Sequence, residues 1–404
     1  MKILYITYDG ISDPLGQSQI LPYLLGLSQK GFEITLVSCE KPLNYRRIKN
    51  QIQNEIKDKI TWIPITYSNT TPLISQYGNL KRIRKAVYQL TEKEEFQIVH
   101  CRSYMAALIG LELKKKYNIK YIFDMRGFWA DERIDGKIWN IFNPLHRLLY
   151  NYFKIKEKAF LNNADAVVSL TEKAKIELLA WKNLKLKDDK IFIIPCCVDV
   201  DFFSPNAETK TDPFTLSYVG SIGTWYLLDE MLLFFKILLN HKPEARFLFI
   251  TRDNPLGILK SATALNLPIN KIIIQAAERS EVPFMLSKSH LSIFFIKPAY
   301  SKIASSPTKL GEILSMGIPV ITNSGIGDVD TIIKSSGTGL IVDRLEEKDF
   351  EAIMARIPEI VSLPAAKMKE TALKYFSLEK GIDQYDKIYR EITSIKELNY
   401  NKVG

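Results

Sequence analysis

The sequence predicts an α/β fold of two Rossmann-like domains, each built around a parallel sheet. Short apolar runs alternate with helical periodicity from the first residues onward, which is typical of βαβ units. The alternation stops at the polar stretch Asn206–Pro213 and then starts again. At 404 residues the chain is also longer than a single core usually encloses. We therefore expect an N-terminal domain over residues 1–205, a C-terminal domain over residues 206–375 and a final helix within residues 376–404.

Each predicted strand is a short run of apolar, mostly β-branched or aromatic residues. In the N-terminal domain the runs are Ile3–Thr7, Ile34–Ser38, Ile60–Ile65, Ile98–Cys101, Tyr121–Asp124, Ala166–Leu170 and Ile191–Ile194. In the C-terminal domain they are Leu216–Val219, Phe247–Ile250, Ile272–Ile274, Leu291–Ile296, Val320–Thr322 and Leu340–Val342. Ligands of open parallel sheets bind beyond the carboxyl ends of the strands. We therefore expect the functional residues in loops that follow strands, around a central cleft that the two domains face.

The composition predicts a folded cytoplasmic enzyme without a metal site. Apolar residues make up 46% of the chain and charged residues 25%, which are ordinary values. The four cysteines match neither a zinc spacing nor a disulfide framework, and the histidines lack a ligand spacing. The strand-like run that follows Met1 is not a secretory signal, and no stretch reaches the roughly 18 apolar residues that span a bilayer.

The positive charge of the chain is concentrated in its first half. The formal charge is +10, and residues 1–200 carry 31 Lys and Arg against 21 Asp and Glu. Such asymmetry favours an anionic partner: membrane phospholipid, a lipid phosphate or nucleic acid. A surface that is merely solubilising remains an alternative. No nucleic-acid-binding motif accompanies the charge, so we expect no nucleic-acid partner.

The segment Ser305–Asn323 is the most informative part of the sequence. Ser306 suits a helix N-cap, Pro307 the first helical position and Gly317 the left-handed position after the helix. A helix that begins beyond a strand points its free N–H groups, including that of Thr308, at a bound anion such as a diphosphate. Along this helix, Lys309 adds a full positive charge. Glu312 lies on the same face and can accept hydrogen bonds from a ribose diol, although an exposed Lys–Glu pair is the alternative.

A glycine-containing turn follows the first strand of the C-terminal domain and precedes a helix expected from Tyr226. Its glycines let the backbone approach a phosphate closely. Arg252, after the next strand, or Lys297 can add positive charge there, unless each is an ordinary surface cation. The expected donor-binding residues are Gly220, Ser221, Gly223, Arg252, Ser306, Thr308, Lys309 and Glu312.

A dense group of charged and aromatic residues, Asp124–Arg133, follows a strand of the N-terminal domain. Arg126 and Arg133 can hold an acceptor phosphate, and Asp124, Asp131 or Glu132 can accept a proton from an attacking hydroxyl. An internally satisfied ion-pair network is the alternative. Arg102 and Ser103 follow another strand and point toward the same cleft. We expect His100, inside that strand, to be a satisfied core histidine.

The segment Ser306–Glu312, with Gly317–Ile321 after it, resembles the donor motif of glycosyltransferase family four. The resemblance extends from Asp13–Gln19 to the terminal Phe376–Lys380. It implies the GT-B fold, a final helix that crosses back to the N-terminal domain, a nucleotide-diphosphate sugar as donor substrate and no metal or other cofactor. It also implies that the first loop, with Gly16 and Gln17, faces the acceptor.

The resemblance implies that the donor sugar is transferred with retention of its anomeric configuration, and that the leaving diphosphate helps to deprotonate the acceptor hydroxyl. Lys309 then stabilises the charge on that diphosphate. On the acceptor side we expect Arg126 and Asp124 to be catalytic. The family usually has two glutamates separated by seven residues, but Ala304 stands at the first position. Because that glutamate contacts the sugar, the hexose or N-acetylhexosamine cannot be assigned.

The expected function is transfer of the sugar to a hydroxyl of a saccharide or polyprenyl-phosphate-linked acceptor at the cytoplasmic membrane face, in bacterial cell-surface polysaccharide or glycolipid synthesis. The apolar and basic segment Ile138–Lys158 and a basic cluster at Lys81, Arg82, Arg84 and Lys85 suit peripheral contact with anionic lipid, with an ordinary domain helix as the alternative. Two other functions remain open: a GT-B sugar-nucleotide epimerase, and a non-catalytic partner subunit of another transferase.

Overall fold

The computed structural model describes residues 1–69, 72–204 and 212–400, which form two compact units. The first unit comprises Met1–Pro195 and the chain from Leu378 onward, and the second comprises Cys196–Ser377. Most of the expected linker, Asn206–Pro213, lies outside the described residues. The chain therefore leaves the first unit once and returns to it with its last helix.

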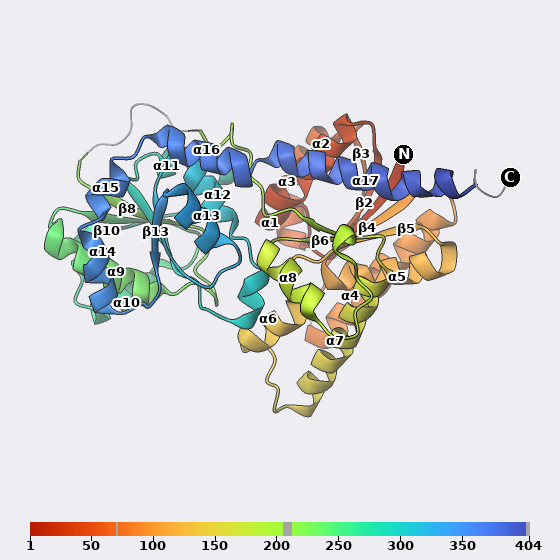
Figure 1. The fold of residues 1–404 in the computed structure, drawn as a ribbon, viewed down its shortest axis with the longest axis horizontal. Helices are drawn as coiled ribbons and strands as arrows, with labels where there is room; N and C mark the ends of the chain where they lie inside the picture. The colour runs from red at the N-terminus through yellow and green to blue at the C-terminus, as the bar shows by residue number, and fades with distance from the viewer. Residues whose placement is uncertain (70–71, 205–211, 401–404) are drawn as a thin grey trace. The chain divides into compact units, whose positions relative to one another are not determined.

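The first unit contains a parallel sheet in the order β3-β2-β1-β4-β5-β6-β7, over the residues that are described (Figure 1). The strands are β1 (Lys2–Thr7), β2 (Glu33–Glu40), β3 (Ile60–Thr66), β4 (Ile98–Arg102), β5 (Lys120–Asp124), β6 (Ala166–Ser169) and β7 (Ile191–Ile193). The central strands are buried on both faces, which explains why they read as nearly continuous apolar runs. All the strands predicted for this domain are confirmed within a residue or two at each end.

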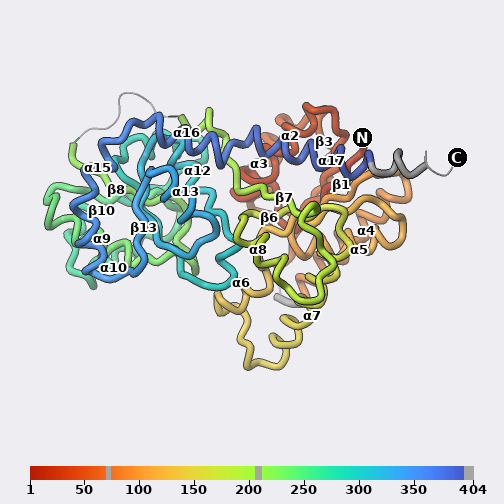
Figure 2. Tube along the Cα trace, viewed as in Figure 1, coloured from red at the N-terminus to blue at the C-terminus, as the bar shows by residue number. Residues whose placement is uncertain are grey.

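The helices of the first unit surround this sheet and include the last helix of the chain (Figure 2). They are α1 (Pro14–Gln19), α2 (Leu21–Gln29), α3 (Pro42–Ile56), α4 (Pro72–Thr91), α5 (Ser103–Tyr117), α6 (Trp129–Asp135), α7 (Pro144–Asn163), α8 (Glu172–Ala180) and α17 (Leu378–Tyr400). Helix α17 packs on α2 at Gly26, where an added Cβ would lie 2.2 Å from Cδ1 of Ile382. The expected return of the final helix to the N-terminal domain is confirmed. Within the described residues no helix has the length and apolar character needed to cross a membrane.

The second unit repeats the architecture with a parallel sheet in the order β10-β9-β8-β11-β12-β13, again over the described part of the chain. Its strands are β8 (Thr215–Val219), β9 (Arg246–Ile250), β10 (Ile272–Gln275), β11 (Leu291–Phe294), β12 (Val320–Asn323) and β13 (Gly339–Val342). Its helices are α9 (Leu228–His241), α10 (Pro255–Ala264), α11 (Val282–Leu286), α12 (Thr308–Ser315), α13 (Val329–Ser336), α14 (Glu347–Met354), α15 (Ile357–Val361) and α16 (Ala365–Tyr375). The predicted strands of this domain are confirmed.

Two predicted helix starts are wrong by one or two residues. Helix α12 begins at Thr308 with Pro307 as its cap residue, and Ser306 does not cap it, because the Ser306 hydroxyl accepts a hydrogen bond from the Cys196 N–H instead. Helix α9 begins at Leu228, since Tyr226 is still extended and bridges to Ile296. The predicted end of α12 is confirmed: Gly317 has a φ of 69°, a conformation that costs glycine little.

Candidate functional site

The side chain of Lys309, in the first turn of α12, lies buried in the second unit. It is 7% exposed, and its Nζ has no hydrogen-bond partner among the described residues. The ammonium lies over two aromatic rings, 3.5 Å from the centroid of Tyr226 and 3.9 Å from that of Tyr218. Burial lowers the pKa of Lys309 well below its ordinary value, although Glu312 and Asp253 oppose the shift. The interpretation of Lys309 and Glu312 as an exposed pair is therefore wrong.

The glycine turn after β8 lies directly against Lys309. Gly220 has a φ of 100°, and a Cβ added there would be 3.4 Å from Lys309 Nζ, so the expected phosphate-binding turn and the start of α12 meet at this ammonium. The turn is held by Asp253, whose carboxylate accepts from the Ser221 hydroxyl and from the Ile222 N–H at 2.6 Å. Gly223 is exposed and has a φ of 48°. Within this turn the N–H of Ile222 therefore already donates to the Asp253 carboxylate.

Glu312 lies one helical turn beyond Lys309 and pairs with Arg279. Its Oε1 is 3.4 Å from a guanidinium nitrogen of Arg279, which also lies over the rings of Phe202 and Phe203. Burial raises the pKa of Glu312, and the nearby Arg279 and Lys309 oppose that rise. The carboxylate is therefore largely buried, at 12% exposure, with the Arg279 guanidinium beside it.

The two other cations near this segment differ in environment. Arg252 is exposed, donates to the Ala277 carbonyl and pairs with Glu278, so the structure places it in a surface ion pair rather than beside Lys309. Lys302 is buried, and its Nζ lies 3.5 Å from the centroid of the Trp225 ring. Lys302 belongs to the short 3-10 helix η4 (Tyr300–Ala304), at whose end stands the alanine that replaces the family's first glutamate.

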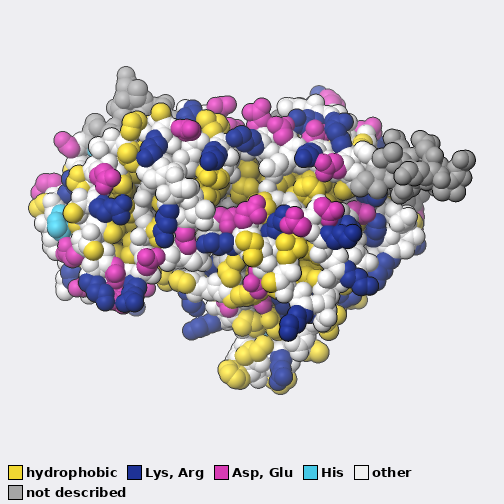
Figure 3. All heavy atoms as spheres, in the orientation of Figure 1, with side chains coloured by type: hydrophobic (Ala, Val, Ile, Leu, Met, Phe, Trp, Pro, Cys, Tyr) yellow, Lys and Arg dark blue, Asp and Glu magenta, His cyan; other side chains and the backbone are white. Residues whose placement is uncertain are grey.

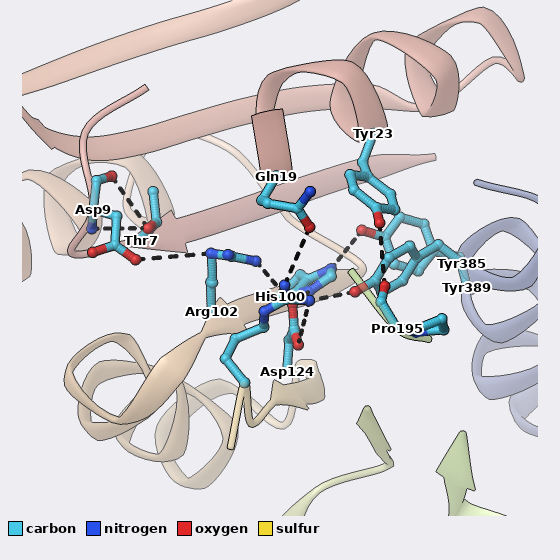
Figure 4. Close-up of polar contacts among 11 residues, drawn as sticks. Thr7, Asp9, Gln19, Tyr23, His100, Arg102, Asp124, Pro195, Tyr385 and Tyr389 are labelled. Atoms are coloured by element: carbon cyan, nitrogen blue, oxygen red, sulfur yellow. Dashed lines mark hydrogen bonds and ion pairs between the residues drawn. The ribbon is translucent and has the colours of Figure 1, made fainter. Parts of the chain in front are cut away.

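In the first unit, Asp124 lies at the centre of a buried polar cluster at the carboxyl ends of β4 and β5 (Figure 4). Its carboxylate is 3.7 Å from a guanidinium nitrogen of Arg102 and 3.8 Å from one of Arg126, and its Oδ1 has no hydrogen-bond partner in the described part of the chain. Burial alone would raise the pKa of Asp124, but Arg126, His100 and Arg102 together lower it below its ordinary value. Asp124 is therefore held ionised between two arginines.

The expectation that His100 is a satisfied core histidine holds for only one of its ring nitrogens. Nδ1 lies 2.7 Å from the hydroxyl of Tyr389, whereas Nε2 faces Asp124 Oδ2 at 3.7 Å and has no hydrogen-bond partner among the residues described. Burial lowers the pKa of His100, with Asp124 opposing the shift. Tyr385, one turn before Tyr389 on α17, donates to Asp124 Oδ2 at 3.2 Å (Figure 4). The last helix thus completes the shell of this cluster.

Arg126 sits in a tight turn at the mouth of the cluster. Arg126 and Gly127 both have positive φ values, 57° and 115°. A guanidinium nitrogen of Arg126 lies 3.4 Å from the amide oxygen of Gln19. Ser103, after β4, also has a positive φ of 66° and begins α5. The structure therefore brings Arg102 and Arg126 together, with Ser103 next to Arg102 in the chain.

The first loop is fixed by a residue that the sequence did not single out. Glu40, at the end of β2, is buried and accepts hydrogen bonds from the N–H groups of Ile11 and Ser12, at 2.9 and 3.0 Å. A Cβ at Gly16 would lie 2.1 Å from the Gly10 carbonyl oxygen, so the missing side chain serves the packing of the loop on itself. Gln17 donates from its amide to the carbonyl of Ser12.

Asp131 and its neighbours on α6 lie in a separate network. The Asp131 carboxylate accepts from the Tyr150 hydroxyl and pairs with Lys154, each at 2.8 Å, and Lys154 also pairs with the buried Glu157. The structure thus matches the internally satisfied network for Asp131. On the same helix, the guanidinium of Arg133 lies over the Trp129 ring at 4.7 Å, and Glu132 is half-buried. Within the described ranges no group of three or more His, Cys, Asp or Glu residues could hold a metal ion.

Two family profiles together span most of the chain. The profile described as Glycosyltransferase Family 4 matches residues 23–202, and the profile described as Glycosyl transferases group 1 matches residues 199–375. The chain belongs to glycosyltransferase family four. The expected assignment as a glycosyltransferase is thereby confirmed.

Individual relatives of this glycosyltransferase are distant in sequence and close in fold. The UDP-Gal:alpha-D-GlcNAc-diphosphoundecaprenol alpha-1,3-galactosyltransferase of Escherichia coli is 18% identical over 333 residues, 75% of this chain and 78% of that protein. Sucrose-phosphate synthase from Thermosynechococcus elongatus superposes with a TM-score of 0.74 at 14% identity, over 98% of this chain and 99% of the other. The Anabaena protein HepE in complex with UDP gives 0.70 at 11% identity, over 97% and 100%. These structures confirm the GT-B fold.

In this glycosyltransferase the sequence-based reasoning overlooked four side chains that shape the two sites. They are Arg279, which pairs with Glu312, Glu40, which holds the first loop, and Tyr385 and Tyr389, which close on Asp124 and His100. Only the tyrosines left a local signal: on the final helix Tyr385, Ile388, Tyr389 and Ile392 recur at the spacing of one buried helical face. Arg279 and Glu40 can be identified only from the structure, because the residues they contact are distant in sequence.

Proposed function

We propose that this protein is a retaining glycosyltransferase that moves a sugar from a nucleotide-diphosphate sugar to a hydroxyl group of a lipid-linked or saccharide acceptor. The observation that carries the proposal is the buried ammonium of Lys309, which has no hydrogen-bond partner in the described chain and lies against the Gly220 turn. A buried cation without a hydrogen-bonded counter-charge is costly. Glu312 and Asp253 only partly oppose the effect of burial on Lys309, so a ligand that brings negative charge would stabilise it. A diphosphate has the right size and charge.

The donor nucleotide is proposed to bind along α12. The ammonium of Lys309 pairs with the diphosphate, and the N–H of Thr308 donates a hydrogen bond to it. The Glu312 carboxylate, which pairs with Arg279, accepts hydrogen bonds from the ribose hydroxyls. The distant structural neighbour HepE is in complex with UDP, which supports a uridine nucleotide as the first one to test. The buried Lys302 and Ala304 lie on the segment where the family's first glutamate would contact the sugar.

The acceptor is proposed to bind in the first unit beside Arg126 and Arg102. Arg102 also lies 3.8 Å from the carboxylate of Asp9, so the phosphate of a polyprenyl-linked acceptor is proposed to contact Arg126, whose side chain is 10% exposed. The name of the Escherichia coli relative describes a diphosphoundecaprenol-linked acceptor, which agrees with this choice.

The proposed reaction breaks the bond between the anomeric carbon and the diphosphate oxygen and forms a new bond between that carbon and the acceptor oxygen on the same face. The proton of the acceptor hydroxyl passes to the departing diphosphate. Lys309 stabilises the negative charge that grows on this diphosphate, which is the main contribution that the protein makes. No step requires a metal or another cofactor.

Peripheral contact with an anionic membrane is part of the proposal, because a polyprenyl-linked acceptor is held in a bilayer. Nucleotide sugars are made in the cytoplasm, so we place the protein at the cytoplasmic face.

A transfer assay tests the proposal. The purified protein is incubated with UDP-sugars and a diphospholipid-linked N-acetylglucosamine, and the anomeric configuration of the product is read by NMR. We expect a glycosylated lipid with the configuration of the donor. Conversion of the UDP-sugar without acceptor would instead indicate a sugar-nucleotide epimerase, and failure to bind any nucleotide sugar would indicate a non-catalytic partner subunit.

A further inference from the structure

An apolar stripe runs along the exposed face of α7 in the first unit. Leu145, Leu148, Tyr152 and Ile155 recur every three or four residues, so they lie on one face of the helix, and Leu148 and Ile155 are 66% and 69% exposed. The opposite face is the one that packs on the domain, through Phe153, Glu157, Phe160 and Leu161. The stripe is therefore not part of the hydrophobic core of the unit.

The segment before α7 extends the same apolar surface. Ile138, Ile141 and Phe142 are all exposed, and Phe142 is 91% exposed. Figure 1 shows that the start of α7 and this preceding segment project from the rest of the first unit. In Figure 3, apolar and basic side chains gather on this projection. We call residues 137–158 the α7 surface.

The charge of the α7 surface is positive. Its basic residues are Lys137, Arg147, Lys154, Lys156 and Lys158, and its single acidic residue, Glu157, is buried and paired with Lys154. Lys137, Arg147 and Lys158 are exposed, whereas Lys156 is half-buried with its ammonium above the Tyr152 ring. Basic groups that flank exposed aromatic and leucine side chains are the pattern of a helix that lies in the interface of an anionic bilayer.

We infer that the α7 surface is a membrane-docking element that inserts Phe142 and the apolar stripe into the headgroup region of an anionic phospholipid bilayer. Lys137, Arg147 and Lys158 then contact lipid phosphates. A second copy of this chain is a poorer occupant, because it would bring two positively charged surfaces together. The inference deepens the proposed function, on which it rests, by naming the element that holds the protein where a lipid-linked acceptor lies.

Vesicle sedimentation tests the inference without any sugar transfer. The full-length protein is mixed with phosphatidylcholine vesicles that contain phosphatidylglycerol or lack it, and no acceptor lipid is present. We expect binding to the anionic vesicles that weakens as salt increases. Absence of binding to anionic vesicles at low salt would overturn the inference.

Matched variants locate the contact. The double variant Leu148→Glu/Ile155→Glu is expected to lose at least about tenfold in vesicle affinity, since two apolar contacts are replaced by negative charges. Leu256→Glu is the control, because Leu256 is also 69% exposed but lies on α10 of the second unit. Arg147→Glu/Lys158→Glu should weaken binding in the same way, with the exposed Lys260→Glu as its control. Equal binding by the wild type and either double variant would contradict the inference.

An environment-sensitive dye reports insertion directly. All four native cysteines are buried, so a dye reacts selectively with Phe142→Cys or with the control Leu256→Cys. The fluorescence emission of the dye at position 142 should shift to shorter wavelength when anionic vesicles are added, and the emission of the dye at position 256 should not shift. Transfer to a water-soluble acceptor should be unchanged in the α7 double variants, so loss of vesicle binding and loss of catalysis are read separately. Self-association that depends on the α7 surface in the absence of vesicles would identify a second copy as the occupant. It would overturn the inference that this surface binds a bilayer.

Discussion

The hydroxyl of Tyr389, on the last helix of the chain, lies 2.7 Å from Nδ1 of His100, which is 289 positions earlier in the sequence. Both side chains are buried, and the other ring nitrogen of His100 faces the carboxylate of Asp124. The contact ties α17 to the polar cluster of the first unit. The chain therefore returns to this unit with a helix that finishes the surroundings of its buried charges.

Tyr389→Phe tests this contact. The substitution keeps the ring but leaves His100 Nδ1 buried without its partner, so we expect a loss of about 1–3 kcal/mol in the free energy of unfolding. Urea denaturation measures it. The matched control is Tyr77→Phe, because Tyr77 is 65% exposed and its replacement should change stability by less than about 0.5 kcal/mol. Equal stability of the two variants would show that the hydrogen bond has no energetic role.

Lys309→Met should stabilise the unliganded protein while abolishing nucleotide binding. Methionine fills a similar volume without the cost of burying a charge, so we expect a gain on the order of 1–3 kcal/mol near neutral pH. The gain should depend on pH. Because burial lowers the pKa of Lys309, the unfolded chain binds more protons than the folded one between the lowered pKa and the usual lysine value.

The wild type should therefore become more stable as the pH rises through that interval, and the advantage of the Lys309→Met variant should shrink. Thermal unfolding at about pH 7 and about pH 9.5 measures both proteins. If the wild type were more stable than the variant at neutral pH, other groups of the protein would already compensate the buried charge of Lys309, and the prediction would be wrong.

Glu40→Gln should loosen the first loop. A neutral amide accepts weaker hydrogen bonds than the carboxylate that now binds the N–H groups of Ile11 and Ser12, so we expect a loss of about 1–2 kcal/mol. Hydrogen exchange of the loop amides should increase. The control Glu244→Gln changes a carboxylate that is 89% exposed, and it should alter neither stability nor exchange. Unchanged exchange at Ile11 and Ser12 in the Glu40→Gln variant would show that the Glu40 carboxylate does not hold the first loop in place.

Arg126→Ala should weaken use of a phosphate-bearing acceptor and spare the donor. Loss of one guanidinium–phosphate contact predicts an increase in acceptor KM of about tenfold or more. The pKa of Asp124 should rise, because Arg126 is the nearby charge that lowers it most. Acceptor kinetics beside UDP titration separate the two effects, with exposed Arg252→Ala as the comparison. If only the affinity for UDP changed, Arg126 would not belong to the acceptor site.

The sequence was sufficient for the parts of the structure that depend on local patterns. Apolar runs predicted each strand, and Gly317, followed by Pro319, predicted the end of α12. The start of α12 was wrong because the Ser306 hydroxyl has a more distant partner, the N–H of Cys196. Local propensity indicates where a helix can begin, but tertiary contacts select among neighbouring residues.

The candidate sites were predictable as segments and not as networks. Lys309, Gly220, Arg102 and Arg126 follow strands and were found by that rule. Arg279, Glu40 and the α17 tyrosines were missed because each acts through a partner that lies in another element. The side chains that satisfy a buried charge are determined by the packing of the unit. The sequence indicates that Tyr385 and Tyr389 share a buried helical face, but it does not indicate which residues they contact.

Titration calorimetry with UDP tests the central claim, that α12 and the Gly220 turn form a nucleotide-diphosphate site. We predict that the wild type binds UDP and that Lys309→Ala and Glu312→Ala each weaken binding by at least about tenfold, one through the diphosphate and the other through the ribose. The control Lys260→Ala removes an exposed charge from the same unit and should bind as the wild type does. Wild-type affinity for UDP in both the Lys309→Ala and Glu312→Ala variants would contradict the account.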